Sequence, residues 1–224
     1  MLRFVAFDMD GTLVDVESSW AAVHAHFGDR NDEGLRRFNA GEIDDHEFLR
    51  SDVKVWHRHR PELTRRELEA ILDGVPLMPG AKALFEALHA ARLTTAIVSG
   101  GIDLLAERIG RELGIDRVLA NGFETDDAGR ITGEGIIRVP IHGKRDVLAW
   151  LQEQLGFAPE ETASVGNSEI DVGLFQRSRV GVAFHPEDAY VRRHATHIVE
   201  SKDLTELIPL LTGPAGTRFT RRPP

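Results

Sequence analysis

The sequence predicts an α/β fold, with a Rossmann-like parallel sheet core and a small all-helical segment inserted after the first strand. In the second half of the chain, short apolar runs alternate with helical patterns, which is typical of parallel sheets with helical crossovers. Between residues 15 and 76, helical spacing recurs and no run is typical of a strand. The 224 residues are enough for one core plus such an insertion.

Composition narrows the function classes before any motif is considered. The formal net charge of −9 disfavours nucleic acid and anionic membranes as general partners, so we expect a small ligand. The chain has no cysteine, which excludes disulfides, thiolate nucleophiles and cysteine-bound zinc. No run reaches the roughly 20 apolar residues of a membrane span, and the N-terminus lacks a signal-peptide pattern. A cytoplasmic location is therefore expected.

The first strand is predicted over residues 3–7, a largely apolar run that ends at two carboxylates, Asp8 and Asp10. Gly11 indicates that the chain turns immediately afterwards. Ligands of open α/β sheets bind outside the carboxyl ends of the strands, and an unpaired buried carboxylate is too costly without a metal or another partner. An Asp-Gly turn that closes a hairpin is the alternative. It is disfavoured because the next residues have a helical pattern and not that of a returning strand.

The insertion is predicted to contain four helices. They are expected at residues 14–27, 32–39, 44–59 and 64–72. Thr64 and Glu67 have the spacing of a capping box. His24 and His26 are two residues apart, which does not place both on one helix face, and we expect them to be solvent-exposed. The position of the insertion suggests a lid that excludes water during chemistry, hinged near Val14 and residues 76–79.

The predicted elements alternate after the insertion. A helix is expected at 79–91, strands are expected at 94–98, 117–120, 163–165 and 180–183, and further helices begin near residues 102, 144 and 171. Residues 122–139, with a turn sequence at 126–129, are typical of an antiparallel hairpin. The tail at 214–224 is rich in Pro, Gly, Thr and Arg and is expected to be flexible.

Polar residues at four predicted strand ends match the requirements of phosphoryl transfer. Asp8 and Asp10 supply a nucleophile and a proton donor. Ser99 and Gly100, in a Ser-Gly-Gly sequence, offer a hydroxyl and close backbone N–H groups for phosphate oxygens, although a plain turn has the same sequence. Lys144 opens a helix and would neutralise a phosphate, although a lone lysine is more often at the surface.

The fourth strand end is the stretch 165–171, which carries the amide and carboxylate oxygens of Asn167 and Asp171. Hard oxygen ligands at this position, together with Asp8, suit Mg²⁺, which takes few protein ligands and keeps several waters. The alternative is a helix N-cap formed by Asn167 or Ser168. Because all four ends occur in order after predicted strands, we favour one shared site.

With these motifs the chain resembles phosphatases of the haloacid dehalogenase (HAD) superfamily, and among them the phosphoserine phosphatase group. The resemblance covers residues 2–211 and implies an HAD fold with a catalytic core at 1–14 and 77–213 and a helical cap at 15–76. It also implies a role for each matching residue: the nucleophile Asp8, the acid/base Asp10, the phosphate-binding residues Ser99, Gly100 and Lys144, and the substrate-binding residue Glu17.

The same resemblance implies a Mg²⁺ ion at Asp8, at Asp10 through its backbone carbonyl, at Asn167 and at Asp171. Hydrolysis through an aspartyl-phosphate is implied, with O-phospho-L-serine of serine biosynthesis as the expected substrate. Asn167 stands where the group usually has a carboxylate. Metal affinity is therefore expected to fall unless Asp171 compensates.

A second departure concerns the substrate. Asp52 stands where a cap arginine would bind a substrate carboxylate, and the replacements considered are Arg50, Arg58 and Arg60. Phosphoglycolate or a sugar phosphate is therefore an alternative substrate, and a phosphate-binding module with impaired turnover is an alternative function. The sequence leaves open whether the protein forms a homodimer.

Overall fold

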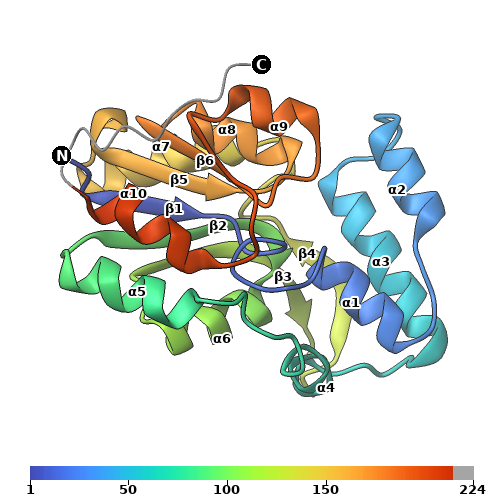
Figure 1. Ribbon diagram of the computed structural model, residues 1–224. Coiled ribbons are helices and arrows are strands. Elements are labelled where there is room, and N and C mark those ends of the chain that lie inside the picture. The colour runs from blue at the N-terminus through green and yellow to red at the C-terminus, as the bar shows by residue number, and fades with distance from the viewer. Residues whose placement is uncertain (214–224) are drawn as a thin grey trace.

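A seven-stranded sheet forms the centre of the protein, whose computed structural model describes residues 1–213 (Figure 1). The spatial order is β4-β3-β2-β1-β5-β6-β7. In chain order the strands are β1 (Phe4–Phe7), β2 (Thr94–Ile102), β3 (Arg117–Thr125), β4 (Ile131–Ile136), β5 (Thr162–Gly166), β6 (Val180–Phe184) and β7 (His197–Val199). Neighbouring strands are parallel except β3 and β4, which are antiparallel. The predicted α/β fold is confirmed, while the predicted tail at 214–224 lies outside the described residues.

Helices cover both faces of the sheet. One face carries α5 (Ala81–Ala90), α6 (Asp103–Leu113) and α10 (Ile208–Thr212), and the other carries α7 (Lys144–Leu155), α8 (Val172–Phe175) and α9 (Ala189–His194). The side chains of β1 show this division, because Val5 and Phe7 pack with the first set and Phe4 and Ala6 with the second. Within residues 1–213, no helix combines the length and apolar character needed to cross a bilayer.

The central strand β1 is fully buried and pairs with β2 on one side and β5 on the other. Phe7, its last residue, lies opposite Ile97 of β2 and Val165 of β5. A continuous apolar run suits this position because both faces of a parallel sheet are covered by helices. The residue that follows, Asp8, therefore emerges between two neighbouring strands at the carboxyl edge of the sheet.

Four helices separate β1 from α5 and lie to one side of the sheet (Figure 1). They are α1 (Ser19–His26), α2 (Asp32–Asn39), α3 (Asp45–His59) and α4 (Arg65–Leu72). The capping box of Thr64 and Glu67 is present, and α3 has a second one formed by Asp44 and Glu47. The two connections to the core pair with each other, since Met78 N–H donates to the Leu13 carbonyl at 2.8 Å. This pairing lies at the boundary expected for the insertion, whose behaviour as a separate cap stays a prediction.

Three elements differ by more than two residues from their predicted bounds. The first inserted helix begins at Ser19 and not at residue 14, because residues 12–14 donate backbone hydrogen bonds back to Met9 and Ser18 caps the helix. β2 continues to Ile102, and β3 continues to Thr125 into the predicted hairpin. Both extensions contain glycines, which are uncommon in strands, so propensity alone predicts that the strands end earlier. Pairing within the sheet keeps these glycines extended.

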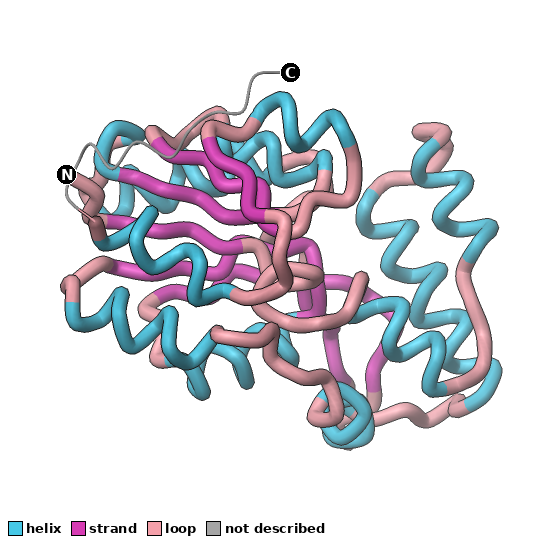
Figure 2. The backbone as a smooth tube through the Cα atoms, viewed as in Figure 1, coloured by secondary structure: helices cyan, strands magenta, loops and turns pink. Residues whose placement is uncertain are grey.

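The hairpin of β3 and β4 supports the inserted helices (Figure 2). Arg50 of α3 forms a bidentate pair with Glu134 of β4, with N···O distances of 2.8 and 3.0 Å. Ile131 N–H donates to the Leu63 carbonyl at 2.8 Å. Leu49 of α3 packs so closely on Gly135 that a Cβ at this position would lie 2.6 Å from Leu49 Cδ1. The insertion thus rests on a platform that the core supplies.

We expect Gly135→Ala to lower the free energy of unfolding by about 1–3 kcal/mol, because Leu49 must shift to admit a methyl group. Urea unfolding followed by circular dichroism measures this change. Gly74→Ala is the matched control, since a Cβ there would meet its nearest neighbour at an ordinary 3.7 Å. Equal stability of both variants would show that the contact between α3 and the hairpin is loosely packed.

Candidate active site

Lys144, the first residue of α7, lies between two carboxylates at the carboxyl edge of the sheet. Its Nζ is 2.6 Å from Asp8 Oδ1 and 2.6 Å from Asp171 Oδ1. All three side chains are buried, with Lys144 only 1% exposed. The cluster joins the end of β1, the start of α7 and the segment that follows β5. It depends on a buried lysine, although most lysines in proteins are exposed to solvent.

Burial raises the pKa of Asp8 to about 7, and the charge of Asp171 adds to the shift while Lys144 opposes it. For Lys144, burial alone would lower the pKa, but the charges of Asp171 and Asp8 outweigh it and hold the pKa above its ordinary value. The lysine therefore remains an ammonium group. Because the pKa of Asp8 lies near neutrality, a further positive charge beside it would favour its ionised form.

Asp10 is held by the start of α1. Its Oδ2 accepts hydrogen bonds from Ser19 N–H at 2.9 Å and from Ser19 Oγ at 2.8 Å. Its Oδ1 is buried and has no hydrogen-bond partner within residues 1–213. Burial raises the pKa of Asp10 to about 6, while the hydrogen bonds from Ser19 oppose the shift. Asp10 is thus a carboxyl group able to exchange a proton near neutral pH, with one oxygen free to do so.

Ser19 was not among the predicted site residues. Besides holding Asp10, its Oγ accepts a hydrogen bond from Ile102 N–H at 3.0 Å and so connects α1 with β2. The only signal in the sequence was a Ser-Ser pair, which predicts a helix N-cap equally well.

Ser99 and Gly100 lie in the last part of β2. Ser99 is buried, and its Oγ accepts a hydrogen bond from Gly101 N–H at 3.1 Å. The Gly100 carbonyl accepts a hydrogen bond from Trp20 Nε1 of α1 at 3.0 Å. Glycine is required at 101, because a Cβ there would lie 2.7 Å from Asp10 Oδ2.

Asn167 follows β5 and touches the loop after β1. Its Nδ2 donates to Glu187 Oε1 at 2.8 Å, and its Oδ1 accepts from Thr12 Oγ at 3.4 Å. Gly11 has a φ of 71°, and a Cβ on it would lie 2.4 Å from Asn167 Nδ2, so two constraints favour glycine. Glu187, in the loop after β6, was missed because nothing in its local sequence marks it as a site residue.

Asp171 stands behind Lys144. While Oδ1 accepts from the lysine, Oδ2 accepts from the N–H groups of Asn167 and Ser168 and from Ser168 Oγ, each at 3.0 Å. Asp171 is completely buried. These contacts favour a positioning role over direct metal ligation, and its assignment as a metal ligand stays a prediction.

A cavity of about 1180 Å³ lies between the carboxyl edge of the sheet and the inserted helices. The predicted site residues that line it are Asp8, Asp10, Glu17, Ser99, Gly100, Lys144 and Asn167. The structure therefore brings together residues from the ends of β1, β2 and β5, from the start of α7 and from the insertion, so Lys144 does not follow a strand as predicted. Asp171 does not line the cavity and reaches it only through Lys144.

The oxygen atoms around this cavity fit a magnesium ion. The carboxylate of Asp8 and the amide oxygen of Asn167 are hard donors that line the cavity, and the backbone carbonyl of Asp10 stays the predicted third donor. Within residues 1–213, no group of three or more His, Cys, Asp or Glu side chains has a metal-binding arrangement. Mg²⁺ commonly takes few protein ligands and keeps several waters, which suits oxygen donors of this kind.

The arginines considered for a substrate carboxylate lie elsewhere. Arg50 pairs with Glu134 and Arg60 with Glu67, and Arg58 lies 3.8 Å from Asp29. None of the three lines the cavity. Within residues 1–213, Arg30 is the one arginine on the cavity wall, and its side chain is exposed.

Known proteins share sequence and fold with this chain. A family model described as haloacid dehalogenase-like hydrolase matches residues 5–176. The phosphoserine phosphatase of Archaeoglobus fulgidus is 31% identical over 96% of this chain, which spans only 62% of that protein. The phosphoserine phosphatase of Idiomarina loihiensis is also 31% identical, with 91% of each chain covered. A solved structure of a substrate-bound phosphoserine phosphatase superposes with a TM-score of 0.79 at 22% identity, covering 94% of this chain and 99% of that one.

We expect Lys144→Met to lower the free energy of unfolding by about 3–5 kcal/mol, because it leaves two buried carboxylates without a cation. The loss should shrink as the pH falls from about 8 to about 5. The folded-state pKa of Asp8 is already raised to about 7, so its protonation in that range removes the uncompensated charge. Denaturant unfolding at several pH values measures this. Lys82→Met, which removes an exposed pair with Glu112, should cost less than about 1 kcal/mol.

Proposed function

Because the chain belongs to the haloacid dehalogenase-like hydrolase family and is a phosphoric monoester hydrolase, we propose that it acts with Mg²⁺ through an aspartyl-phosphate on Asp8. The observation that carries this proposal is the position of Asp8. Its carboxylate follows the central strand, is bound by Lys144 at 2.6 Å and opens onto a cavity that Asp10 shares.

In the proposed first step, an oxygen of Asp8 attacks phosphorus and the bond between phosphorus and the leaving oxygen breaks. Asp10 donates its proton to that oxygen, and its pKa of about 6 allows this near neutral pH. In the second step, Asp10 takes a proton from water as the water oxygen attacks phosphorus. Phosphate leaves, and the Asp8 carboxylate is restored.

The remaining residues bind charge. Lys144 stabilises negative charge on Asp8 and on the phosphoryl oxygens, while Ser99 and the N–H groups beside Gly100 lie where they can bind those oxygens. The Asp8 carboxylate, the Asp10 backbone carbonyl and the Asn167 amide oxygen would hold Mg²⁺. When bound, this ion favours the ionised form of Asp8 and offsets the charge of the phosphate.

O-phospho-L-serine is the substrate that the relatives favour, since several of them are named phosphoserine phosphatase. Glu17 lines the cavity and is available for the substrate amine. This substrate would place the enzyme in L-serine biosynthesis, in the cytoplasm. Another small phosphorylated metabolite is the second candidate, because the arginines considered for a carboxylate lie outside the cavity.

We expect Asp8→Asn to reduce Mg²⁺-dependent phosphate release at least about a thousandfold, because the amide is not a nucleophile. Release of phosphate from p-nitrophenyl phosphate, with Mg²⁺ and with EDTA, measures this. Circular dichroism and thermal unfolding serve as the control for folding. Substantial hydrolysis by a folded Asp8→Asn variant would refute the assignment of the nucleophile.

We expect Asn167→Asp to tighten Mg²⁺ binding on the order of tenfold, because it adds a negative charge to the ligand set. Isothermal titration calorimetry on both forms measures the dissociation constant. Without metal the variant should be less stable, since Glu187 loses its amide donor and faces a second carboxylate. An unchanged dissociation constant would mean that position 167 does not contact the ion.

A further inference from the structure

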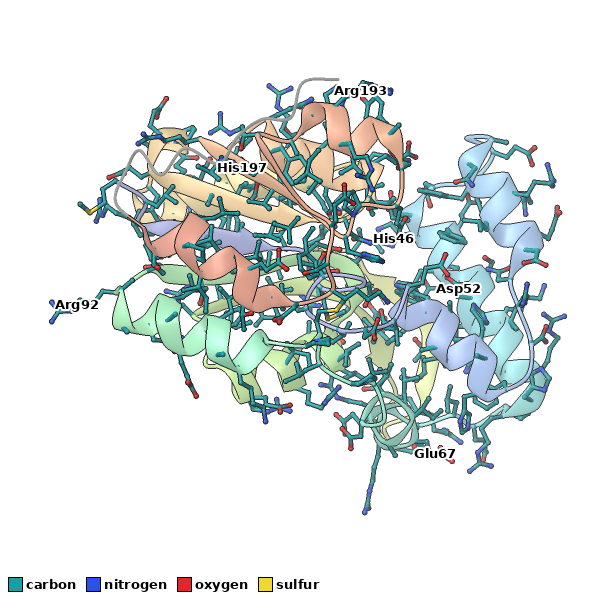
Figure 3. The ribbon with its side chains drawn as sticks, in the orientation of Figure 1. His46, Asp52, Glu67, Arg92, Arg193 and His197 are labelled. Carbon is teal, nitrogen blue, oxygen red and sulfur yellow. The ribbon has the colours of Figure 1, made fainter. Side chains whose placement is uncertain are left out.

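The inserted helices contribute a buried carboxylate to the wall of the catalytic cavity. Asp52 projects from α3 within the group of inserted helices (Figure 3) and is 4% exposed. Its Oδ1 lies 2.8 Å from His24 Nε2 and accepts a hydrogen bond from Asn31 Nδ2, also at 2.8 Å. Asp52, His24 and Asn31 all line the cavity. His24, expected from its spacing to be solvent-exposed, is in fact buried.

The protonation state of His24 follows from its second neighbour. Trp56 Nε1 lies 3.0 Å from His24 Nδ1, and an indole nitrogen can only donate a hydrogen bond. His24 Nδ1 must therefore accept and carry no proton. The ring hydrogen is then on Nε2, which donates to Asp52, and the imidazole is neutral. Because Trp56 is completely buried, it cannot turn away without disrupting the packing of the insertion.

The negative charge of Asp52 consequently has no compensating cation in the protein. Two neutral donors bind Oδ1, and within residues 1–213 no hydrogen bond or ion pair reaches Oδ2. A buried carboxylate in this state is costly, and a structural role alone would be served as well by an uncharged amide. The unpartnered oxygen at the cavity wall instead suits a ligand that brings a positive charge.

The other charges on the wall point the same way. Glu17, Asp32 and Asp45 add negative charge. Lys144 is occupied by two carboxylates, and Arg30 is exposed at the cavity wall. The part of the cavity wall that the inserted segment supplies therefore attracts a cation and repels a carboxylate.

We propose that Asp52 binds an ammonium group on the leaving alcohol of the substrate. The preferred substrates are then phosphate monoesters of small amino alcohols, and a carboxylate on the same alcohol adds nothing to recognition. Asp52 acts as a specificity-determining residue, oriented by His24 and Asn31. This inference rests on the proposed phosphatase function and specifies its substrate class.

A matched pair of substrates tests the proposal on the unmodified enzyme. O-phosphoethanolamine and 2-hydroxyethyl phosphate differ only by an ammonium group in place of a hydroxyl. We expect kcat/KM to be higher for the ammonium ester by about tenfold to a hundredfold, as for a hydrogen bond to a charged partner. O-phospho-L-serine, which adds a carboxylate, should be no better than O-phosphoethanolamine. Equal values for the matched pair, or a clear preference for O-phospho-L-serine over O-phosphoethanolamine, would overturn the proposal.

The variant Asp52→Asn tests the residue itself. The amide can still accept from His24 and Asn31 through its oxygen but carries no charge. We expect the preference for O-phosphoethanolamine over 2-hydroxyethyl phosphate to fall to near one, mainly through a higher KM for the ammonium ester. Asp127→Asn, which removes a charge from the exposed hairpin turn, should keep the preference. A folded Asp52→Asn enzyme that keeps the preference would overturn the proposal.

These experiments distinguish failure of this inference from failure of the proposed function. If the chain is not a phosphatase, neither ester releases phosphate in the presence of Mg²⁺. If the chain is a phosphatase but Asp52 does not bind an ammonium group, both esters release phosphate at similar kcat/KM. If Asp52→Asn does not fold, the comparison of substrates on the unmodified enzyme decides.

Discussion

The bridge from Lys144 to two carboxylates is the interaction on which the site depends. A lysine that is 1% exposed can remain charged only if anions surround it, and its charge offsets the cost of burying the two carboxylates beside it. The three groups therefore fix one another. They also fix the backbone, since Asp171 binds the N–H groups of the loop that carries Asn167. A carboxylate held in this way loses little freedom when a ligand arrives.

The second constraint is that the cavity belongs to two parts of the chain. The sheet supplies the groups for chemistry, and the inserted helices supply a wall with its own buried polar network. The β3–β4 hairpin joins these parts, because α3 packs on it through Leu49 and Arg50. Substrate selection can thus change without moving Asp8, since the residues of α1 and α3 that face the cavity are not those that hold this carboxylate.

The sequence predicted the sheet, and most of the residues that it proposed for the site line one cavity. Apolar runs ending at Asp8 and Asn167 mark buried parallel strands, and the carboxyl ends of such strands necessarily meet at one edge. Spacing and propensity describe residues that are close in the sequence, so they could not reveal contacts between distant segments. Nothing near Asp52 indicates that His24 of α1 and Asn31, the residue before α2, bind its carboxylate, and spacing alone suggested an exposed histidine. Glu187 and Ser19 were missed for the same reason, because each acquires its role from a residue far away in the chain or beyond a turn.

The double role of Ser19 has a consequence for the order of events in turnover. Its backbone and hydroxyl groups both bind Asp10 Oδ2, and the same hydroxyl accepts from the end of β2. Any outward swing of α1 that widens the entrance would withdraw both donors from Asp10 at once. Entry of a molecule and proton transfer by a correctly held Asp10 would then exclude each other. Bulk water would reach the site only while Asp10 lacks its two hydrogen bonds from Ser19.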